Sequence, residues 1–149
     1  MSNYLPTDYQ SFIHKSRYAK WLEDEGRREE WPETVERYMK NVVGDVDCYF
    51  EIEEAIVNLD IMPSMRALMT AGKAMDRDNT CAYNCSYLPV DHPRSFDEAM
   101  FILLCGTGVG FSVERENIEK LPPICETFRS TGEIVVADSK EGWARAYKE

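Results

Sequence analysis

The stretch NCSYLPVDHPRSFDEAMFILLCGTGVGFSVE, residues 84–114, decides the fold class of this chain. It opens with CSYLPV, which is typical of a short strand that ends at Pro89 or soon after. Ser95 can then cap the helix DEAMFILLC, and because this helix is apolar nearly all round, we expect it to be buried. The segment GTGVG follows and leads into FSVE, a second strand. This order of strand, helix and strand predicts an α/β fold with a mainly parallel sheet or barrel.

The residues before this stretch predict a helical N-terminal region over residues 1–60. Apolar residues recur at helical spacing over residues 9–22, from Trp31 to about Gly44, and over residues 48–59. Pro32 suits the first turn of the second of these helices. The charged run EDEGRREE that precedes it is interpreted as a solvated loop or helix end.

The second region, residues 61–149, begins with a short helix over PSMRALMTAG and ends with one further strand and helix. EIVVA, residues 133–137, is typical of a strand, and Asp138 or Ser139 can cap the helix KEGWARAYKE. About three strands are visible, fewer than a closed barrel needs. We therefore expect an unfinished α/β fold, and the last helix, which reaches Glu149 without a stop signal, favours a divided chain.

The charge balance excludes some classes of partner. With 17 basic and 27 acidic residues the formal net charge is −10, which disfavours binding to duplex nucleic acid or to a membrane surface. The polar N-terminus lacks the apolar segment of a secretory signal, and the longest apolar stretch, residues 99–105, is too short to cross a bilayer. We expect a cytoplasmic protein.

The cysteines allow several interpretations. Their odd number, without an export signal, argues against a disulfide framework. Cys81 and Cys85 form a C-x3-C pair that is compatible with half a zinc site, with redox chemistry by an exposed thiol, or with buried packing. Cys48 and Cys105 lie in apolar segments and are expected to be buried. Neither His14 nor His92 has an obvious partner.

The glycines at 106, 108 and 110 do not form a dinucleotide-binding loop, because they follow a helix and open a strand. Two interpretations remain. Gly106 can end the helix in a left-handed conformation, and the backbone of residues 107–110 can approach a ligand closely because side chains are absent there.

Four segments in register carry a resemblance to a known family: RYAKWLEDEGRREEWPETVERYM, MPSMRALMTAG, NCSYLPVD and FILLCGTGVGFSVE. Together they resemble the N-terminal portion of the ribonucleotide reductase large, catalytic chain, in particular its adenosylcobalamin-dependent class II branch. The resemblance extends from about Arg17 onward. It implies that residues 61–149 form the first part of a ten-stranded α/β barrel, which this chain leaves incomplete.

The resemblance also implies roles for individual residues. Cys85 matches the cysteine of the first barrel strand, which serves as one half of a redox-active pair in thiyl-radical reduction of a ribonucleotide. Asn84 and Ser64 match positions close to the substrate, and Gly108 matches a glycine whose backbone approaches the nucleotide. The resemblance therefore favours the close-approach interpretation of the glycine cluster. It implies no metal site, and Cys81 has no counterpart.

The resemblance also implies partners, because it places several parts of the active site outside this chain. The radical-bearing cysteine, the second redox cysteine and the phosphate-binding loop are expected beyond residue 149. The implied partners are a second chain that carries the C-terminal remainder, a thioredoxin-like reductant and a ribonucleotide substrate. Adenosylcobalamin is the implied cofactor, with its contacts outside this chain. Two alternatives remain: a non-catalytic remnant or protein-interaction module of a reductase, and a small zinc-binding module built on Cys81 and Cys85.

Overall fold

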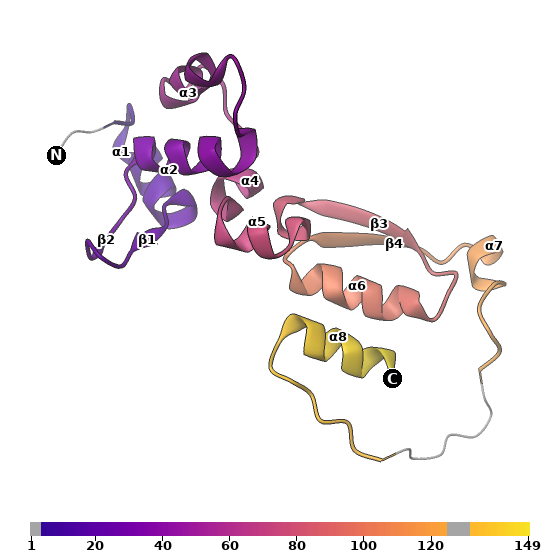
Figure 1. The fold of residues 1–149 in the computed structure, drawn as a ribbon. Helices are drawn as coiled ribbons and strands as arrows, with labels where there is room; N and C mark the ends of the chain where they lie inside the picture. Colours follow the sequence, from indigo (N-terminus) through magenta and orange to yellow (C-terminus); the bar gives the residue numbers. More distant parts are fainter. Residues whose placement is uncertain (1–3, 125–131) are drawn as a thin grey trace. The chain divides into compact units, whose positions relative to one another are not determined.

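The computed structural model describes residues 4–124 and 132–149 (Figure 1). The chain divides into two compact units, Met1–Ala82 and Tyr83–Glu149. This division rests on compactness. The division expected after residue 60 separates a helical region from the beginning of a barrel, and it stays a prediction. Within the described residues, no helix is both long and apolar enough to cross a membrane.

The first unit is mainly helical, as the sequence predicts. Its elements are α1 (Asp8–Ile13), the π-helix η1 (His14–Tyr18), β1 (Trp21–Leu22), β2 (Arg27–Arg28), α2 (Trp31–Tyr38), the π-helix η2 (Met39–Val43), α3 (Tyr49–Val57), α4 (Met65–Thr70), α5 (Lys73–Arg77) and the 3-10 helix η3 (Asn79–Ala82). The helix predicted to continue through Leu22 is wrong at its end, because Trp21 and Leu22 pair antiparallel with β2. Gly26 adopts a φ of 62° in the connecting turn.

The core of this unit is an apolar cluster that gathers around one face of α2. Its buried members are Leu5, Trp31, Val35, Met39, Ile56 and Leu68. Burying an aliphatic side chain of this size contributes about 1.5–3 kcal/mol. The indole Nε1 of Trp31 also donates to the carbonyl oxygen of Val57 at 3.0 Å, so this side chain joins α2 to the end of α3.

The start of α2 is fixed by side chains, which confirms the beginning predicted near Trp31 and Pro32. Glu30 and Glu33 form a capping box, in which the Glu33 carboxylate accepts from the backbone N–H of Glu30 at 2.6 Å. Arg27 from β2 donates to both oxygens of Glu33 at 2.7 Å. These hydrogen bonds, from Arg27 first and the Glu30 N–H second, lower the pKa of Glu33 to about 2.

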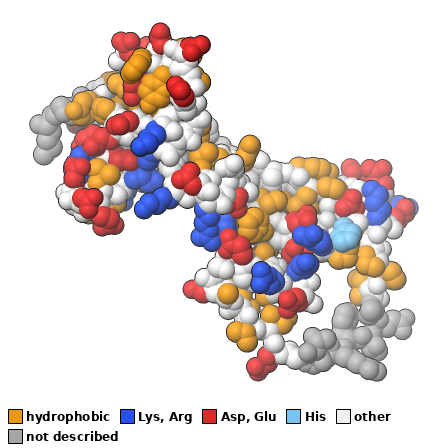
Figure 2. All heavy atoms as spheres, in the orientation of Figure 1, with side chains coloured by type: hydrophobic (Ala, Val, Ile, Leu, Met, Phe, Trp, Pro, Cys, Tyr) orange, Lys and Arg blue, Asp and Glu red, His pale blue; other side chains and the backbone are white. Residues whose placement is uncertain are grey.

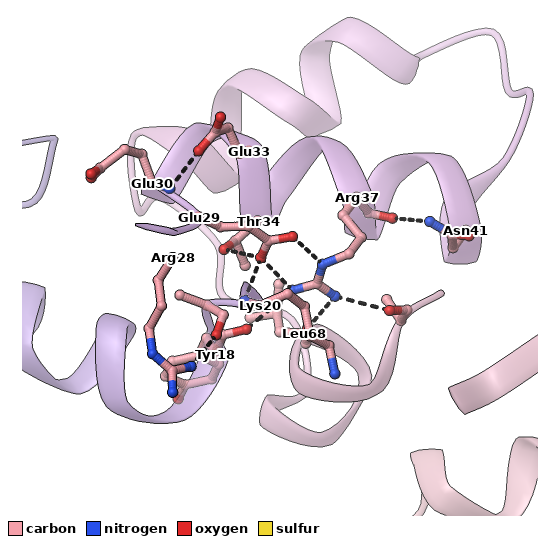
Figure 3. A network of polar contacts seen from close by, with 12 residues as sticks. Tyr18, Lys20, Arg28, Glu29, Glu30, Glu33, Thr34, Arg37, Asn41 and Leu68 are labelled. Atoms are coloured by element: carbon pink, nitrogen blue, oxygen red, sulfur yellow. Dashed lines mark hydrogen bonds and ion pairs between the residues drawn. The ribbon is translucent and has the colours of Figure 1, made fainter. Parts of the chain in front are cut away.

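Behind α2 lies a buried ion pair between Glu29 and Arg37 (Figure 3). Arg37 Nε and Nη2 donate to the two oxygens of Glu29 at 2.7 and 2.9 Å. The other guanidinium protons reach the backbone carbonyl oxygens of Tyr18, Leu68 and Ala71, at 3.1, 2.9 and 3.0 Å. All five donors of the guanidinium are thus used, and one side chain connects η1, α2 and α4.

Glu29 continues the network toward His14. Its Oε2 accepts from the Thr34 hydroxyl at 3.0 Å and from the Lys20 backbone N–H at 2.9 Å. Burial opposes ionisation of Glu29, but the hydrogen bonds from Arg37, Lys20 and Thr34 outweigh it and lower the pKa of this carboxyl. The His14 Nε2 lies 2.8 Å from Thr34 Oγ1, and burial lowers the pKa of His14. The run EDEGRREE, interpreted as solvated, therefore contains a core carboxylate.

The free energy of unfolding should fall as the pH is lowered from about 7 to about 4. A lowered pKa for His14 means that the folded state favours the neutral ring, so stability is lost as the pH falls below about 6.5. Lowered pKa values for Glu29 and Glu33 give stability that is present above about 4.5 and lost below it. Urea unfolding across this range measures the slope. His14→Phe should remove the part above pH 5 only, and a flat profile would contradict these ionisation states.

The second unit contains the strand, helix and strand predicted from residues 84–114. Its elements are β3 (Cys85–Pro89), α6 (Arg94–Leu104), β4 (Gly108–Ser112), α7 (Arg115–Ile118) and α8 (Lys140–Lys148). β3 and β4 pair in parallel, with α6 as the connection between them (Figure 1). The predicted parallel α/β arrangement is confirmed to this extent. β4 begins at Gly108, earlier than FSVE suggested, because the glycines themselves enter the strand.

Other expectations for this unit are wrong. Residues 133–137 form no strand. Ser95 does not cap α6, whose cap residue is Pro93; instead, the Ser95 hydroxyl donates to the carbonyl oxygen of Pro89 at 3.0 Å. The described residues contain two sheets of two strands each, so a ten-stranded barrel stays a prediction.

Helix α8 packs along α6 (Figure 1). Its cap is Ser139, one of the two residues predicted, and the Ser139 Oγ accepts from Gly142 N–H at 3.0 Å. The ammonium group of Lys140 lies 4.9 Å from the centre of the Phe101 ring. The expected burial of α6 is wrong for part of its surface, where Phe96, Leu103 and Leu104 are exposed. Figure 2 shows such hydrophobic side chains at the surface among acidic and basic ones.

Candidate active-site face

The beginning of the β3–β4 pair brings together three of the four predicted site residues. Cys85 is the first residue of β3 and lies directly opposite Gly108, the first residue of β4. Asn84 precedes Cys85, and its carbonyl oxygen accepts from the Gly108 N–H at 2.9 Å. Because side chains alternate along a strand, Cys85 shares one face of the pair with Tyr87, Gly108 and Gly110. We call these four residues the Cys85 face.

Local sequence fixes the register of the Cys85 face. Helix α6 ends at Leu104 with Cys105 as its cap, and Gly106 follows with a φ of 84°, which confirms the predicted left-handed helix end. Thr107 is 2% exposed, and its hydroxyl donates to the Tyr83 carbonyl oxygen at 2.8 Å. This bond joins the residues that precede the two strands. If the pairing of β3 with β4 slipped by one residue, Cys85 would move to the opposite face of the sheet. Because the Thr107 bond fixes the register, it keeps the thiol on this face.

The Cys85 face is open. Asn84 and Cys85 are exposed, and Tyr87 is 67% exposed. A Cβ added at Gly108 would meet the Asn84 carbonyl oxygen at 3.5 Å, an ordinary contact distance. A Cβ at Gly110 would meet the Ser86 carbonyl oxygen at 3.6 Å. Packing among the described residues therefore does not require glycine at either position, and these residues leave the bare backbone open to approach.

The remaining predicted site residue, Ser64, lies in the other compact unit. It is the exposed cap residue of α4, and its side chain makes no capping hydrogen bond. Its carbonyl oxygen accepts from the Leu68 N–H at 3.0 Å, which starts the helix. Its predicted place near a substrate stays a prediction.

The other thiols lie in different settings. Cys48 is exposed because it precedes α3 rather than lying within it, so its expected burial is wrong. Cys81 is half-buried in η3, and Cys105 is half-buried with its Sγ accepting from Lys140 Nζ at 3.1 Å. Cys125 lies outside the described residues. In the part of the chain that is described, no three His, Cys, Asp or Glu side chains converge as metal ligands, so the zinc-module alternative gains no support there.

Two features of the site escaped the sequence interpretation. Tyr87 belongs to no recognised motif, although alternation along CSYL places it on the same face as Cys85. Thr107 stands among glycines, and nothing in its local sequence indicates a partner at Tyr83. The histidines, left unassigned, both have structural partners: His14 bonds to Thr34, and the Nδ1 of His92 accepts from the Arg94 N–H at 3.1 Å.

Comparisons with known proteins support the resemblance. No family model matches the chain. It is 28% identical, over 91% of its length, to the adenosylcobalamin-dependent ribonucleoside-triphosphate reductase of Lacticaseibacillus paracasei, of which it spans 23%. Reductases of the same description from Lactobacillus delbrueckii subsp. bulgaricus and Lactobacillus leichmannii are 26% and 25% identical to it over the same shares. The chain thus spans about a quarter of the length of the curated relatives that it matches.

A solved structure agrees with these relatives. The crystal structure of a B12-dependent, class II ribonucleotide reductase superposes with a TM-score of 0.73 at 22% identity, over 91% of this chain and 28% of that chain. This likeness confirms that the chain has a mixed helix and sheet fold shared with a class II reductase. Over 91% of its length, the chain is therefore homologous to an N-terminal portion of the adenosylcobalamin-dependent ribonucleoside-triphosphate reductases.

Proposed function

We propose that this chain supplies one side of the active site of a ribonucleotide reductase, with Cys85 as one half of its redox-active cysteine pair. The observation that carries the proposal is the position of an exposed thiol at the first residue of β3, opposite Gly108 on an open face. Homology to ribonucleoside-triphosphate reductases supports the reaction class. The second redox cysteine and the radical-bearing cysteine belong to parts of the reductase outside this chain, in the same or a second polypeptide.

The chemistry requires two thiols. A thiyl radical on another cysteine abstracts the 3′ hydrogen of the ribonucleotide, and the 2′ hydroxyl then leaves as water. The Cys85 thiol and its partner supply two electrons and two protons, and they become a disulfide. The cysteine that took the 3′ hydrogen then returns it to C3′ of the product, which restores the thiyl radical. Thiolate exchange with a thioredoxin-like protein restores the two thiols, and the exposure of Cys85 suits this exchange.

The neighbouring residues position the substrate in this proposal. Asn84 adjoins the thiol, and the bare backbone at Gly108 lets the nucleotide approach. For Ser64 we propose the role near the substrate that the resemblance implies. Adenosylcobalamin supplies the radical when it is bound. The residues described here do not fit that cofactor by themselves, because the Cys85 face is only two strands wide and the imidazole of His14 is buried against Thr34. We place its contacts outside this chain.

The substitution Gly108→Ala tests the substrate side of the proposal. We expect the free energy of unfolding of the chain to stay equal or to rise slightly, because the added Cβ meets only ordinary contacts and alanine is the better strand residue. In the reductase that contains this chain, KM for the ribonucleotide should rise about tenfold, the equivalent of ~1.4 kcal/mol of lost binding. Steady-state kinetics and urea unfolding measure the two effects.

Gly110→Ala is the matched control. It adds the same methyl group to the same face, but opposite Tyr87 rather than Cys85. We expect it to change KM less than Gly108→Ala does. Equal effects at both positions would show that the whole face, rather than the backbone at Gly108, limits binding. An unchanged KM in Gly108→Ala would remove that residue from the substrate pocket.

A further inference from the structure

The first unit contains a small apolar cavity that the proposed reductase chemistry does not use. Its volume is about 160 Å³, and it lies where α1, η1, the start of α2 and the residues after α3 meet. Its wall includes Leu5, Ile13, His14, Trp31, Leu59 and Met62. Met62 is 56% exposed, so the rim of the cavity is accessible, while His14 and Trp31 are buried.

The size of the cavity selects a class of ligand. An apolar cavity of about 150 Å³ in a protein core stays free of water and binds benzene. The present cavity is of the same size, and aromatic and aliphatic side chains dominate its wall. One six-membered aromatic ring therefore fits it. The Trp31 ring already meets the His14 ring edge to face, with centroids 5.5 Å apart, and this is the geometry that a further ring would find favourable.

Polar side chains of the wall include Gln10, whose Oε1 already accepts from the Thr7 hydroxyl at 2.7 Å, and the buried His14. The Thr34 hydroxyl has one proton and donates it to Glu29, so the His14 Nε2 must donate to Thr34 Oγ1. Burial lowers the pKa of His14 and favours the neutral ring, whose other nitrogen, Nδ1, is then an acceptor. In the described part of the chain, Nδ1 has no hydrogen-bond partner. No side-chain nitrogen there is both buried and unpartnered, so Nδ1 keeps access to free space.

A second residue of the wall, Leu59, has a backbone conformation that is unfavourable for its type. Leu59 follows the end of α3 with a φ of 66°, a conformation that costs a bulky residue free energy and that glycine adopts easily. The helix end is closed around it by the Asp60 N–H, which donates to the Ala55 carbonyl oxygen at 2.9 Å. Leucine at this position supplies a side chain to the cavity wall that glycine would lack.

From these observations we infer that the cavity is a binding site for a small aromatic ring that carries a hydroxyl or N–H donor, with His14 Nδ1 as the acceptor. The ring is a phenol-like group. It comes either from a free small molecule or from a tyrosine side chain elsewhere in the reductase. A donor is required because a purely apolar ring would leave Nδ1 without a partner inside a dry site.

Binding of phenol and toluene to the unmodified chain tests the proposal. The two rings have nearly the same shape, and toluene is the more hydrophobic, so transfer from water alone favours toluene. We expect phenol to bind more tightly, by about tenfold. The reason is that its hydrogen bond to His14 Nδ1 contributes more than the difference between the two rings in free energy of transfer from water. The ¹⁵N resonance of His14 Nδ1 should shift with phenol and stay in place with toluene. Equal or weaker binding of phenol, or an unmoved Nδ1 resonance, would overturn the proposal, as would the failure of both to bind at millimolar concentrations.

His14→Phe provides the matched variant. It keeps a ring beside Trp31 and removes the acceptor, so phenol binding should fall to the level of toluene while toluene binding stays the same. The nitrogen resonance of the unmodified chain keeps the test decisive if this variant folds poorly. The source of the natural ring follows from the assembled reductase. Phenol binding that survives assembly indicates a free ligand, and phenol binding that assembly blocks indicates a side chain of the reductase itself.

Discussion

Replacing Cys85 with serine should abolish thioredoxin-coupled multiple turnover in the reductase that contains this chain. Serine keeps the shape of the side chain, but its oxygen cannot form the disulfide that a two-electron reduction of the substrate must leave behind. We expect a loss of about a thousandfold or more, on the scale seen when a covalently reacting group is removed from an enzyme. The assay is the rate of deoxyribonucleotide formation with thioredoxin and its reductase in excess.

Cys48→Ser is the control for this experiment. Cys48 is also exposed, but it precedes α3 in the other unit and lies near no proposed site residue along the chain. Its replacement should leave turnover unchanged, so a loss confined to Cys85→Ser separates redox function from the general loss of a thiol. Undiminished multiple turnover in Cys85→Ser would contradict the proposed function. The phenol site would be untouched by that outcome, because it lies in the other unit.

Arg37→Ala should destabilise the first unit by about 3–5 kcal/mol, the cost expected when one partner of a buried ion pair is removed. The loss leaves the Glu29 carboxylate, only 4% exposed, without its main counter-charge. It also leaves the carbonyl oxygens of Leu68 and Ala71 without their donor. Urea unfolding followed by tryptophan fluorescence measures the change, since Trp31 lies in the core of the same unit.

Arg27→Ala is the matched control because Arg27 also binds a glutamate through two hydrogen bonds. Its partner, Glu33, and its own side chain are each more than one-third exposed, so solvent screens this pair. We expect a much smaller loss than for Arg37→Ala. Similar losses in the two variants would show that burial does not set the strength of the Glu29–Arg37 pair.

The unit around Cys85 was largely predictable because its signals are local. Pro89 lies at the end of β3, Gly106 supplies the left-handed end of α6, and the apolar helix between two short strands indicates a parallel crossover. The face that Cys85 shares with Gly108 follows once the two strands are paired in register. The resemblance to reductases, rather than spacing, provided the reaction.

The features that escaped prediction depend on partners far away in the sequence. Glu29 lies in a run of surface-like charges, and only the approach of Arg37 and Thr34 makes it a core residue. Trp21 continues the helical spacing of α1, yet pairing with β2 takes it out of the helix. Residues 133–137 have strand propensity, but strand propensity is expressed through pairing with a neighbour, and no neighbour pairs with them in the described residues.

The pairing of β3 with β4 across a single helix has a consequence for the order of folding. These three elements lie within residues 85–112, so the strands that must meet are close in sequence and the entropy lost on joining them is small. Cys85 and Gly108 can thus reach their relative positions before distant segments arrive. In the described residues, the outer edges of this sheet keep unpaired backbone groups. We therefore expect this pair of strands to form early in folding, while both of its outer edges are still open to further pairing.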